Sequence, residues 1–258
     1  EGTFPYKHVV IDEGQDFGKE EIDEVEIIEL LKENTIENEE RNGTFYLFYD
    51  KNQIVQSNKV PKYIEDADCK LTLYRNCRNT ENIALTSLRL LGSDKAPKLY
   101  PGAVMGDLPE IGFCATKEDV VTLLNAEIDK YIDGGYNSIT ILTCKTEESS
   151  IIADCCNDSK YNYKRGYVKF TTCRKFKGLE SDIIIVVDID RDTFKDDGEQ
   201  LMYVGTSRAR FKLSCIINMT EDECLSLMDK RDIKYNRNIY KSFATAFNAK
   251  VLLNSNRS

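Results

Sequence analysis

The sequence predicts an α/β fold in which parallel sheets are covered by helices. Short, continuously apolar segments rich in β-branched residues alternate along the chain with segments of helical periodicity. Strands that are apolar on both faces are typical of parallel sheets, because the crossover helices hide each face from water. The chain has 258 residues, enough for two lobes, since a single core stops growing near ~250 residues.

The first part of the chain shows the order strand, helix, strand, helix. The segments that carry these patterns are residues 7–12, 19–33, 44–49 and 80–91. Asn79 or Thr80 is suited to cap the free amides at the start of the last of these helices.

The second part of the chain repeats the alternation after a stretch with Pro97, Pro101 and Pro109. Prolines break regular structure, so this stretch marks a domain boundary or an insertion. Beyond it we expect helices at 117–133, 148–156, 199–209 and 221–230, and strands at 138–143, 168–171, 182–188 and 211–218.

The bulk composition argues against two classes of protein. The net charge of −9 disfavours a protein that coats nucleic acid nonspecifically, since such binding depends on many lysine and arginine contacts to phosphates. No apolar run approaches the ~20 residues of a membrane-spanning helix, and residues 1–5 do not resemble a signal peptide. We therefore expect a cytoplasmic protein without a membrane partner, and interpret the amino terminus as a cut inside a longer polypeptide.

The nine cysteines lack the spacing of a metal site. None of them forms a C-x-x-C pair, and His8 is the single histidine, so zinc-ligand spacing is absent. This pattern favours a reduced, cytosolic chain. Cys144 and Cys215 lie in apolar segments, where a free cysteine packs as a small hydrophobic side chain.

A local basic segment at 160–177 is the candidate contact for a single nucleic-acid strand. Its lysines and arginines alternate with aromatic side chains, as in grooves on which successive bases stack. A solvated loop beside a strand edge is an equal alternative. The candidate nucleic-acid contacts in and around this segment are Tyr163, Tyr167, Thr172, Arg174 and Lys175.

An acidic cluster, D-E-G-Q-D at 12–16, directly follows the first predicted strand. In α/β sheets the carboxyl ends of strands carry the ligand chemistry. A carboxylate at Asp12 is suited to hold Mg²⁺ through water, and Glu13 to orient and deprotonate a water that attacks ATP. Taken alone, the cluster is equally well a helix amino terminus, where acidic side chains favour the dipole.

With its downstream motifs, the chain resembles superfamily-one helicases of the UvrD/Rep type. Five segments are similar to the family's motifs in the same order, namely VIDEGQDF (10–17, motif II), LFYDKNQ (47–53, motif III), LYRNCRNT (73–80, motif IV), TCRKFKGLE (172–180, motif V) and MYVGTSRA (202–209, motif VI). The form of motif V resembles that of the helicases found beside nuclease-related (NERD) domains.

The resemblance implies a role for one or two residues of most motifs. Asp12 and Glu13 of motif II would act in ATP hydrolysis with Mg²⁺, and Gln53 of motif III would sense the γ-phosphate. Arg78 of motif IV and Arg208 of motif VI would contact the γ-phosphate, where an arginine neutralises charge as the bond breaks. Taken by itself, without the other motifs, Arg208 would instead be an ordinary surface charge on a helix.

Motif V is implied to serve both nucleotide and nucleic acid. Its nucleotide contacts would be Lys177, Gly178 and Glu180. Two positions depart from the family pattern: Tyr49 of motif III replaces the usual glycine, and Arg174 of motif V replaces the usual histidine.

The resemblance also implies two RecA-like lobes and a missing part. Residues 1–72 would be the carboxy-terminal part of the first lobe and 73–258 the second. The P-loop motif, G-x-x-x-x-G-K-[ST], is absent from the chain and belongs upstream in the family order, so the chain alone should not hydrolyse ATP. The whole protein would move on single-stranded DNA, or RNA. The alternative, supported by Tyr49 and Arg174, is a non-catalytic module that keeps the fold and binds nucleic acid or protein.

Overall fold

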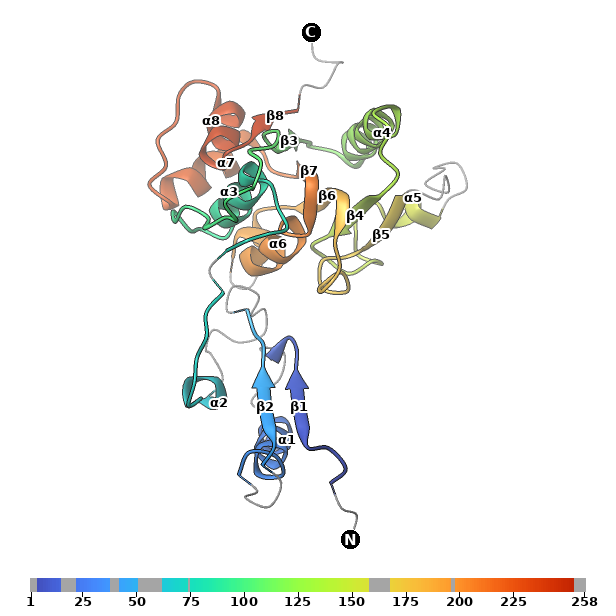
Figure 1. Cartoon of the computed structure of the whole chain (residues 1–258). Helices are drawn as coiled ribbons and strands as arrows, with labels where there is room; N and C mark the ends of the chain where they lie inside the picture. Colours follow the sequence, from blue (N-terminus) through green and yellow to red (C-terminus); the bar gives the residue numbers. More distant parts are fainter. Residues whose placement is uncertain are drawn as a thin grey trace. The chain divides into compact units, whose positions relative to one another are not determined.

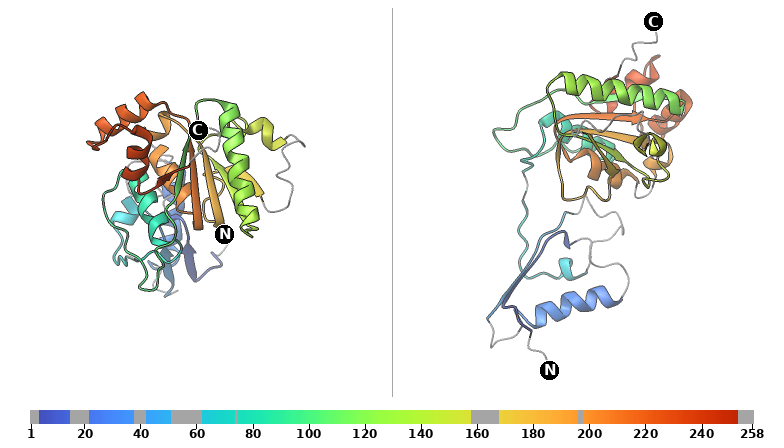
Figure 2. Two further views of the ribbon diagram at one scale, coloured as in Figure 1. Left: turned by 90° about the horizontal axis from the view of Figure 1, so that it is seen from above. Right: turned by 90° about the vertical axis from the view of Figure 1, so that its right-hand side faces the viewer.

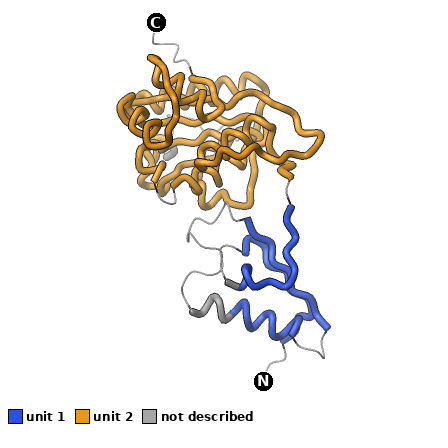
Figure 3. The backbone as a smooth tube through the Cα atoms, turned by 90° about the vertical axis from the view of Figure 1, so that its left-hand side faces the viewer, with its two compact units in different colours: residues 1–73 blue, residues 74–258 orange. Residues whose placement is uncertain are grey.

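The computed structural model describes most of the chain as two compact units. The described residues are 4–14, 22–37, 42–50, 62–73, 75–157, 168–195 and 198–252 (Figure 1). The units span Glu1–Leu73 and Tyr74–Ser258 (Figure 3). Among the described residues, no helix is both long and apolar enough to cross a bilayer.

Unit 1 contains a two-stranded parallel sheet. Strand β1 (His8–Ile11) pairs with β2 (Thr44–Leu47), and helix α1 (Ile22–Glu33) connects them, as the sequence predicts. A short helix, α2 (Lys62–Glu65), follows. On one face of the sheet Val10 and Tyr46 are exposed, although they are large apolar side chains in register with each other.

Unit 2 is built on a sheet whose six described strands are all parallel. Their order is β5-β4-β6-β7-β3-β8, and the central strands β4 and β6 are almost completely buried. The bounds are β3 Glu110–Phe113, β4 Ile139–Thr143, β5 Val168–Thr172, β6 Ser181–Ile189, β7 Ala209–Ile217 and β8 Lys250–Val251.

Helices cover both faces of this sheet (Figure 2). Helices α4 (Lys117–Asp133) and α5 (Ala153–Asn157) lie on one face, and α4 packs its apolar stripe against β4, β6 and β7. The other face carries α3 Glu81–Leu90, α6 Gly198–Thr206, α7 Glu221–Lys230 and α8 Ile239–Ala246, together with a 3₁₀ turn at Asp192–Phe194. The predicted α/β class, with parallel sheets flanked by helices as in a RecA-like lobe, is confirmed.

The proline-containing stretch is an excursion inside unit 2 rather than a boundary. Asn76 forms a parallel bridge with Leu99, so the stretch returns to the segment that precedes α3. It leads into β3, which the sequence analysis missed because only four residues form it and one is Gly112. A Cβ atom at Gly112 would lie 2.2 Å from Leu123 Cδ2, so the glycine allows α4 to pack closely on β3.

The end of α6 differs from the prediction in a way that matters for motif VI. The helix ends at Thr206 instead of residue 209, and Ala209 already begins β7. Ser207 and Arg208 therefore lie in the turn between helix and strand.

Candidate nucleotide and nucleic-acid site

Motif II places its acidic residues directly after β1. The Glu13 backbone N–H donates to Asp12 Oδ1 over 2.9 Å, and Glu13 has a φ of 53°, which is uncommon for a residue other than glycine. The next residue, Gly14, donates its N–H to Phe48 O over 2.7 Å and lies against Leu47. The turn is thereby fixed to the end of β2, with Asp12 exposed and Glu13 half-buried.

Asp12 of motif II is the predicted Mg²⁺ ligand. Among the described residues, no group of three histidine, cysteine or acidic side chains is placed to hold a metal ion. Mg²⁺ ordinarily takes one or two carboxylates and completes its shell with water and substrate phosphates. A single exposed carboxylate, as at Asp12, is compatible with that kind of site and not with a closed metal cage.

Motif III is described only in part. Tyr49 and Asp50 follow β2, and Tyr49 is exposed. Gln53, the predicted γ-phosphate sensor, lies outside the described residues, because these stop at 50 and resume at 62.

Motif IV is a tight turn organised by one asparagine. Asn76 Oδ1 accepts the backbone N–H of Arg78 over 2.9 Å and that of Asn79 over 3.2 Å. This turn projects the Arg78 side chain toward motif V, where its Nε donates to Glu180 Oε2 over 3.0 Å. Glu180 also faces Arg210 Nε at 3.6 Å, so one carboxylate lies between two guanidinium groups.

The start of α3 corrects the capping prediction. Thr80 is the N-cap residue, but its side chain makes no capping hydrogen bond. The free amides of Glu81 and Asn82 instead donate to the carbonyls of Val104 and Met105, each over 3.0 Å. The side chain of Asn79 is used elsewhere, in a contact with motif VI.

Motif VI holds its arginine in a buried turn. Arg208 is 2% exposed, so its interpretation as a surface helix charge is wrong. Its backbone N–H donates to Gly205 O over 3.2 Å, and its Nε donates to Val204 O over 3.2 Å. Asn79 Nδ2 donates to the carbonyls on both sides of the arginine, over 2.9 Å to Ser207 and 2.5 Å to Ala209.

Motif V forms a compact turn at the carboxyl end of β5. Thr172 is buried, and its Oγ1 accepts the backbone N–H of Lys175 over 3.1 Å. The turn ends at Gly178, whose φ of 82° is left-handed and favours glycine. Arg174 and Lys175 are exposed, Lys177 is half-buried, and Lys175 Nζ lies 3.1 Å from the Glu147 carboxylate.

Motifs V and VI pack against each other through a cysteine and a glycine. A Cβ atom at Gly205 would lie only 2.6 Å from Cys173 Sγ, so α6 approaches the motif V turn closely because position 205 lacks a side chain. Sequence reasoning did not link these two residues.

The predicted single-strand track is only partly described. Tyr163 and Tyr167 lie outside the described residues, which exclude 158–167. Lys169 is exposed, whereas Phe170 packs against the hydrophobic core beneath α4 and is not an open stacking surface.

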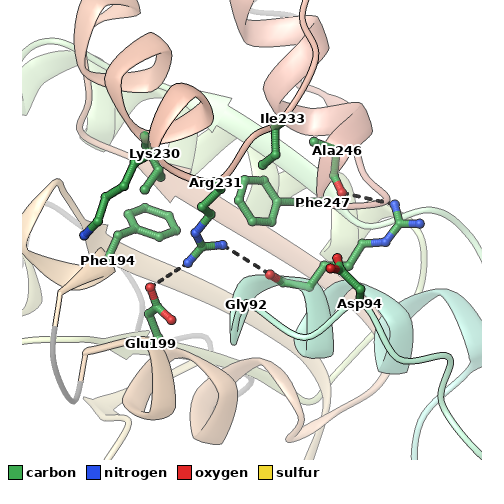
Figure 4. Close-up of a pocket in the computed structure, with 11 residues that line it drawn as sticks. Gly92, Asp94, Phe194, Glu199, Lys230, Arg231, Ile233, Ala246 and Phe247 are labelled. Atoms are coloured by element: carbon green, nitrogen blue, oxygen red, sulfur yellow. Dashed lines mark hydrogen bonds and ion pairs between the residues drawn. The ribbon is translucent and has the colours of Figure 1, made fainter.

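A pocket of about 420 Å³ on unit 2 is lined by residues that lie outside motifs IV, V and VI. It lies between α3, α6, α7 and α8, and Arg231 reaches into it (Figure 4). Arg231 Nη2 donates to Glu199 Oε1 over 2.6 Å, and its guanidinium carbon lies 5.5 Å from the Phe194 ring centre and 5.4 Å from that of Phe247. These contacts join α6 and the 3₁₀ turn to the ends of α7 and α8, which is the arrangement of a structural junction.

Comparison with known proteins places the family resemblance on unit 2. Residues 167–215 match the model of the UvrD-like helicase C-terminal domain, a stretch that holds motifs V and VI. A similar solved structure is the C-terminal domain of a possible DNA helicase from Lactobacillus plantarum WCFS1. It has a TM-score of 0.42 and 19% identity, over 55% of this chain and 87% of that one. No curated protein matches the chain.

Proposed function

We propose that this chain, whose residues 167–215 match the model of the UvrD-like helicase C-terminal domain, is part of an ATP-driven motor. The whole protein would couple ATP hydrolysis to movement along single-stranded DNA, or RNA. Motor activity of this kind needs groups that bind the nucleotide, groups that respond to its γ-phosphate and groups that bind the strand.

The observation that carries the proposal is the convergence of motifs IV, V and VI within unit 2. Arg78 pairs with Glu180 over 102 positions of sequence, and Asn79 reaches Ser207 over 128 positions. Segments this distant come together beside the turns that lead into β6 at Ser181 and β7 at Ala209, two neighbouring parallel strands. Their convergence supports a shared nucleotide-binding function.

Arg78 and Arg208 are the residues that we propose respond to the γ-phosphate. A guanidinium group placed on the transferred phosphoryl group neutralises the charge that spreads over its oxygens. Gln53, Lys177, Gly178 and Glu180 complete the proposed nucleotide contacts of motifs III and V.

Asp12 and Glu13 are proposed as the acidic pair for hydrolysis. ATP with Mg²⁺ supplies the phosphoanhydride bond and part of the charge neutralisation when it is bound. Asp12 would hold the cation through water, and Glu13 would orient the attacking water and accept its proton. The turn that ties Gly14 to Phe48 supports these roles, because it keeps both acids at the strand end.

Motif V is proposed to contact the nucleic-acid strand. Thr172 ends β5, and Arg174 and Lys175 in the turn beyond it are exposed basic groups that suit phosphates. Tyr163 and Tyr167 remain the proposed stacking residues.

An upstream segment of the same polypeptide is the proposed partner of unit 1. The sheet of β1 and β2 leaves Val10, Tyr46 and Phe48 exposed on one face, at 64%, 58% and 53%. A two-stranded sheet is marginal by itself. Additional strands would extend it at its edges, and the helices that connect them would cover this face. We propose that the missing P-loop comes with those strands, and that the chain alone does not hydrolyse ATP.

The test is ATP hydrolysis by the full-length protein, measured with and without single-stranded DNA or RNA. Glu13→Gln and Arg208→Ala are each expected to lower kcat by ~10³-fold or more, as the loss of an arginine finger does. The chain spanning residues 1–258 alone is expected to be inactive. Normal hydrolysis in both variants would show that the roles assigned to Glu13 and Arg208 are wrong. An inactive full-length protein that still binds single strands favours the non-catalytic module instead.

A further inference from the structure

Asn79 makes two hydrogen bonds that enclose Arg208. Its Nδ2 donates both of its protons, one to Ser207 O at 2.9 Å and one to Ala209 O at 2.5 Å. Asn79 is 5% exposed, so water does not readily replace these bonds. The residue between the two bonded carbonyls is the motif VI arginine.

The orientation of this amide group is fixed by a second asparagine. Asn76 Nδ2 donates to Asn79 Oδ1 over 2.7 Å, which leaves the Asn79 nitrogen to face the two carbonyls. The Oδ1 atom of Asn76 is held in turn by the backbone N–H groups of Arg78 and Asn79. The motif IV turn and the motif VI turn thus form one hydrogen-bonded unit.

We propose that Asn79 is a positioning residue that sets the place of Arg208 and couples it to Arg78. This inference rests on the proposed function, because it assigns Asn79 to the same γ-phosphate response. Asn79 touches no substrate itself. Its side chain fixes the backbone on both sides of Arg208, and its own backbone directly follows Arg78.

These hydrogen bonds fix the position of the guanidinium group at the end of the long Arg208 side chain. Without the Asn79 amide, the carbonyls of Ser207 and Ala209 lose buried donors, and the turn between α6 and β7 is free to shift. A misplacement of ~1 Å at a catalytic group can lower a rate by roughly 100-fold. Other residues bind the rest of the nucleotide. Loss of the Asn79 amide is therefore expected to lower kcat and to leave KM for ATP nearly unchanged.

The test is a double-mutant cycle on ATP hydrolysis by the full-length protein. Asn79→Ala is expected to lower kcat by roughly 10- to 100-fold while KM for ATP changes by less than about threefold. The double variant Asn79→Ala with Arg208→Ala should be no slower than Arg208→Ala alone, because residues that act as one unit are not additive. Asn79→Ser, which keeps one hydroxyl donor, should recover part of the rate.

Asn82→Ala is the matched control. Asn82 lies in α3, three residues beyond Asn79, and its Nδ2 donates to Gly106 O over 2.9 Å, away from motif VI. It should leave kcat unchanged. Thermal melting of each variant separates a loss of fold from a loss of positioning, and Asn79→Ser carries the test if Asn79→Ala does not fold.

Two results overturn different claims. If Arg208→Ala hydrolyses ATP normally, the proposed γ-phosphate role of Arg208 fails. If Arg208→Ala is impaired but Asn79→Ala is normal, or if their effects multiply in the double variant, the positioning role of Asn79 is wrong while the proposed function stands.

Discussion

Arg78 and Glu180 form an ion pair with a distance of 3.0 Å from Nε to Oε2, although 102 positions separate them in the sequence. The pair joins motif IV to motif V. Both side chains are partly open to water, at 35% and 47% exposure. Solvent screening therefore limits what the pair contributes to stability.

Glu180→Gln is expected to change the free energy of unfolding by less than about 1 kcal/mol, as for other exposed ion pairs. Urea unfolding of the chain measures the change. A loss of several kcal/mol would show that Glu180 is a structural residue whose role does not depend on nucleotide.

The contact between Gly205 and Cys173 predicts a pair of substitutions that compensate. Gly205→Ala should destabilise the protein by about 1–3 kcal/mol, because its Cβ would lie 2.6 Å from Cys173 Sγ. Removing the sulfur in the double variant with Cys173→Ala should restore stability, helped by the ~1 kcal/mol gain of alanine over glycine in a helix. Chemical unfolding of the two single variants and the double variant gives the coupling energy. Additive effects would contradict the close packing of motifs V and VI.

Arg231 is expected to be a stability residue. Arg231→Ala removes its bonds to Glu199 and to the carbonyl of Arg89, and its stacking on Phe194 and Phe247. We expect a loss of about 2–4 kcal/mol in the free energy of unfolding, since the Glu199 carboxylate would remain partly buried without a partner. Lys230→Ala, at the adjacent exposed position, is the control and should change stability by less than about 0.5 kcal/mol. Equal effects of the two would show that the junction carries no stability.

The buried carboxylate of Glu127 predicts that the free energy of unfolding depends on pH. Burial raises the pKa of Glu127 above its ordinary value of 4.5, against the opposing effect of hydrogen bonds from Lys130 and Ser214. A raised pKa in the folded state favours the protonated form. Its contribution to stability is therefore present below pH 4.5 and is lost as pH rises through the raised value.

Glu127→Gln should consequently gain stability relative to the natural protein as pH increases from 4 to 7. Urea unfolding across this range measures the difference, with Asp129→Asn on the exposed side of the same helix as control. Glu110 and Tyr131 both interact with Glu127, so neither is substituted in the comparison. A difference that is constant across the range would contradict the raised pKa.

Local signals predicted those elements whose ends are fixed by nearby residues. Helix α4 begins after Thr116, whose side chain accepts the Asp119 N–H, and α7 begins with a capping box between Thr220 and Glu223. Both helices have the predicted bounds. Such caps are readable because all partners lie within four residues of sequence.

Contacts between residues far apart in the sequence were not predicted. The pattern around Asn79 predicted a helix cap, because nothing local indicates that its side chain reaches residues 207 and 209 instead. Helix α8 was missed although it has a local cap, since the Asn238 side chain accepts the Lys241 N–H. Strand β8 was missed because it depends on long-range pairing. β8 has only two residues, which form a strand by pairing with β3, and a two-residue segment carries no period of its own.

The candidate site divides in the same way. The family resemblance implied that Arg78, Glu180 and Arg208 belong to one nucleotide site, and the structure of unit 2 shows how motif IV contacts motif V and motif VI. The sequence did not indicate that Arg208 is buried or that the hydrogen bonds of Asn79 enclose it. The roles of Asp12, Glu13 and the other site residues stay predictions.

The most direct test of the central claim is displacement of streptavidin from biotin-ended single strands by the full-length protein. The motor predicts displacement from one end with ATP, none with a non-hydrolysable analogue, and none by the Glu13→Gln variant. ATP hydrolysis without displacement from either end, or displacement that survives Glu13→Gln, would contradict an ATP-driven motor that moves along a single strand.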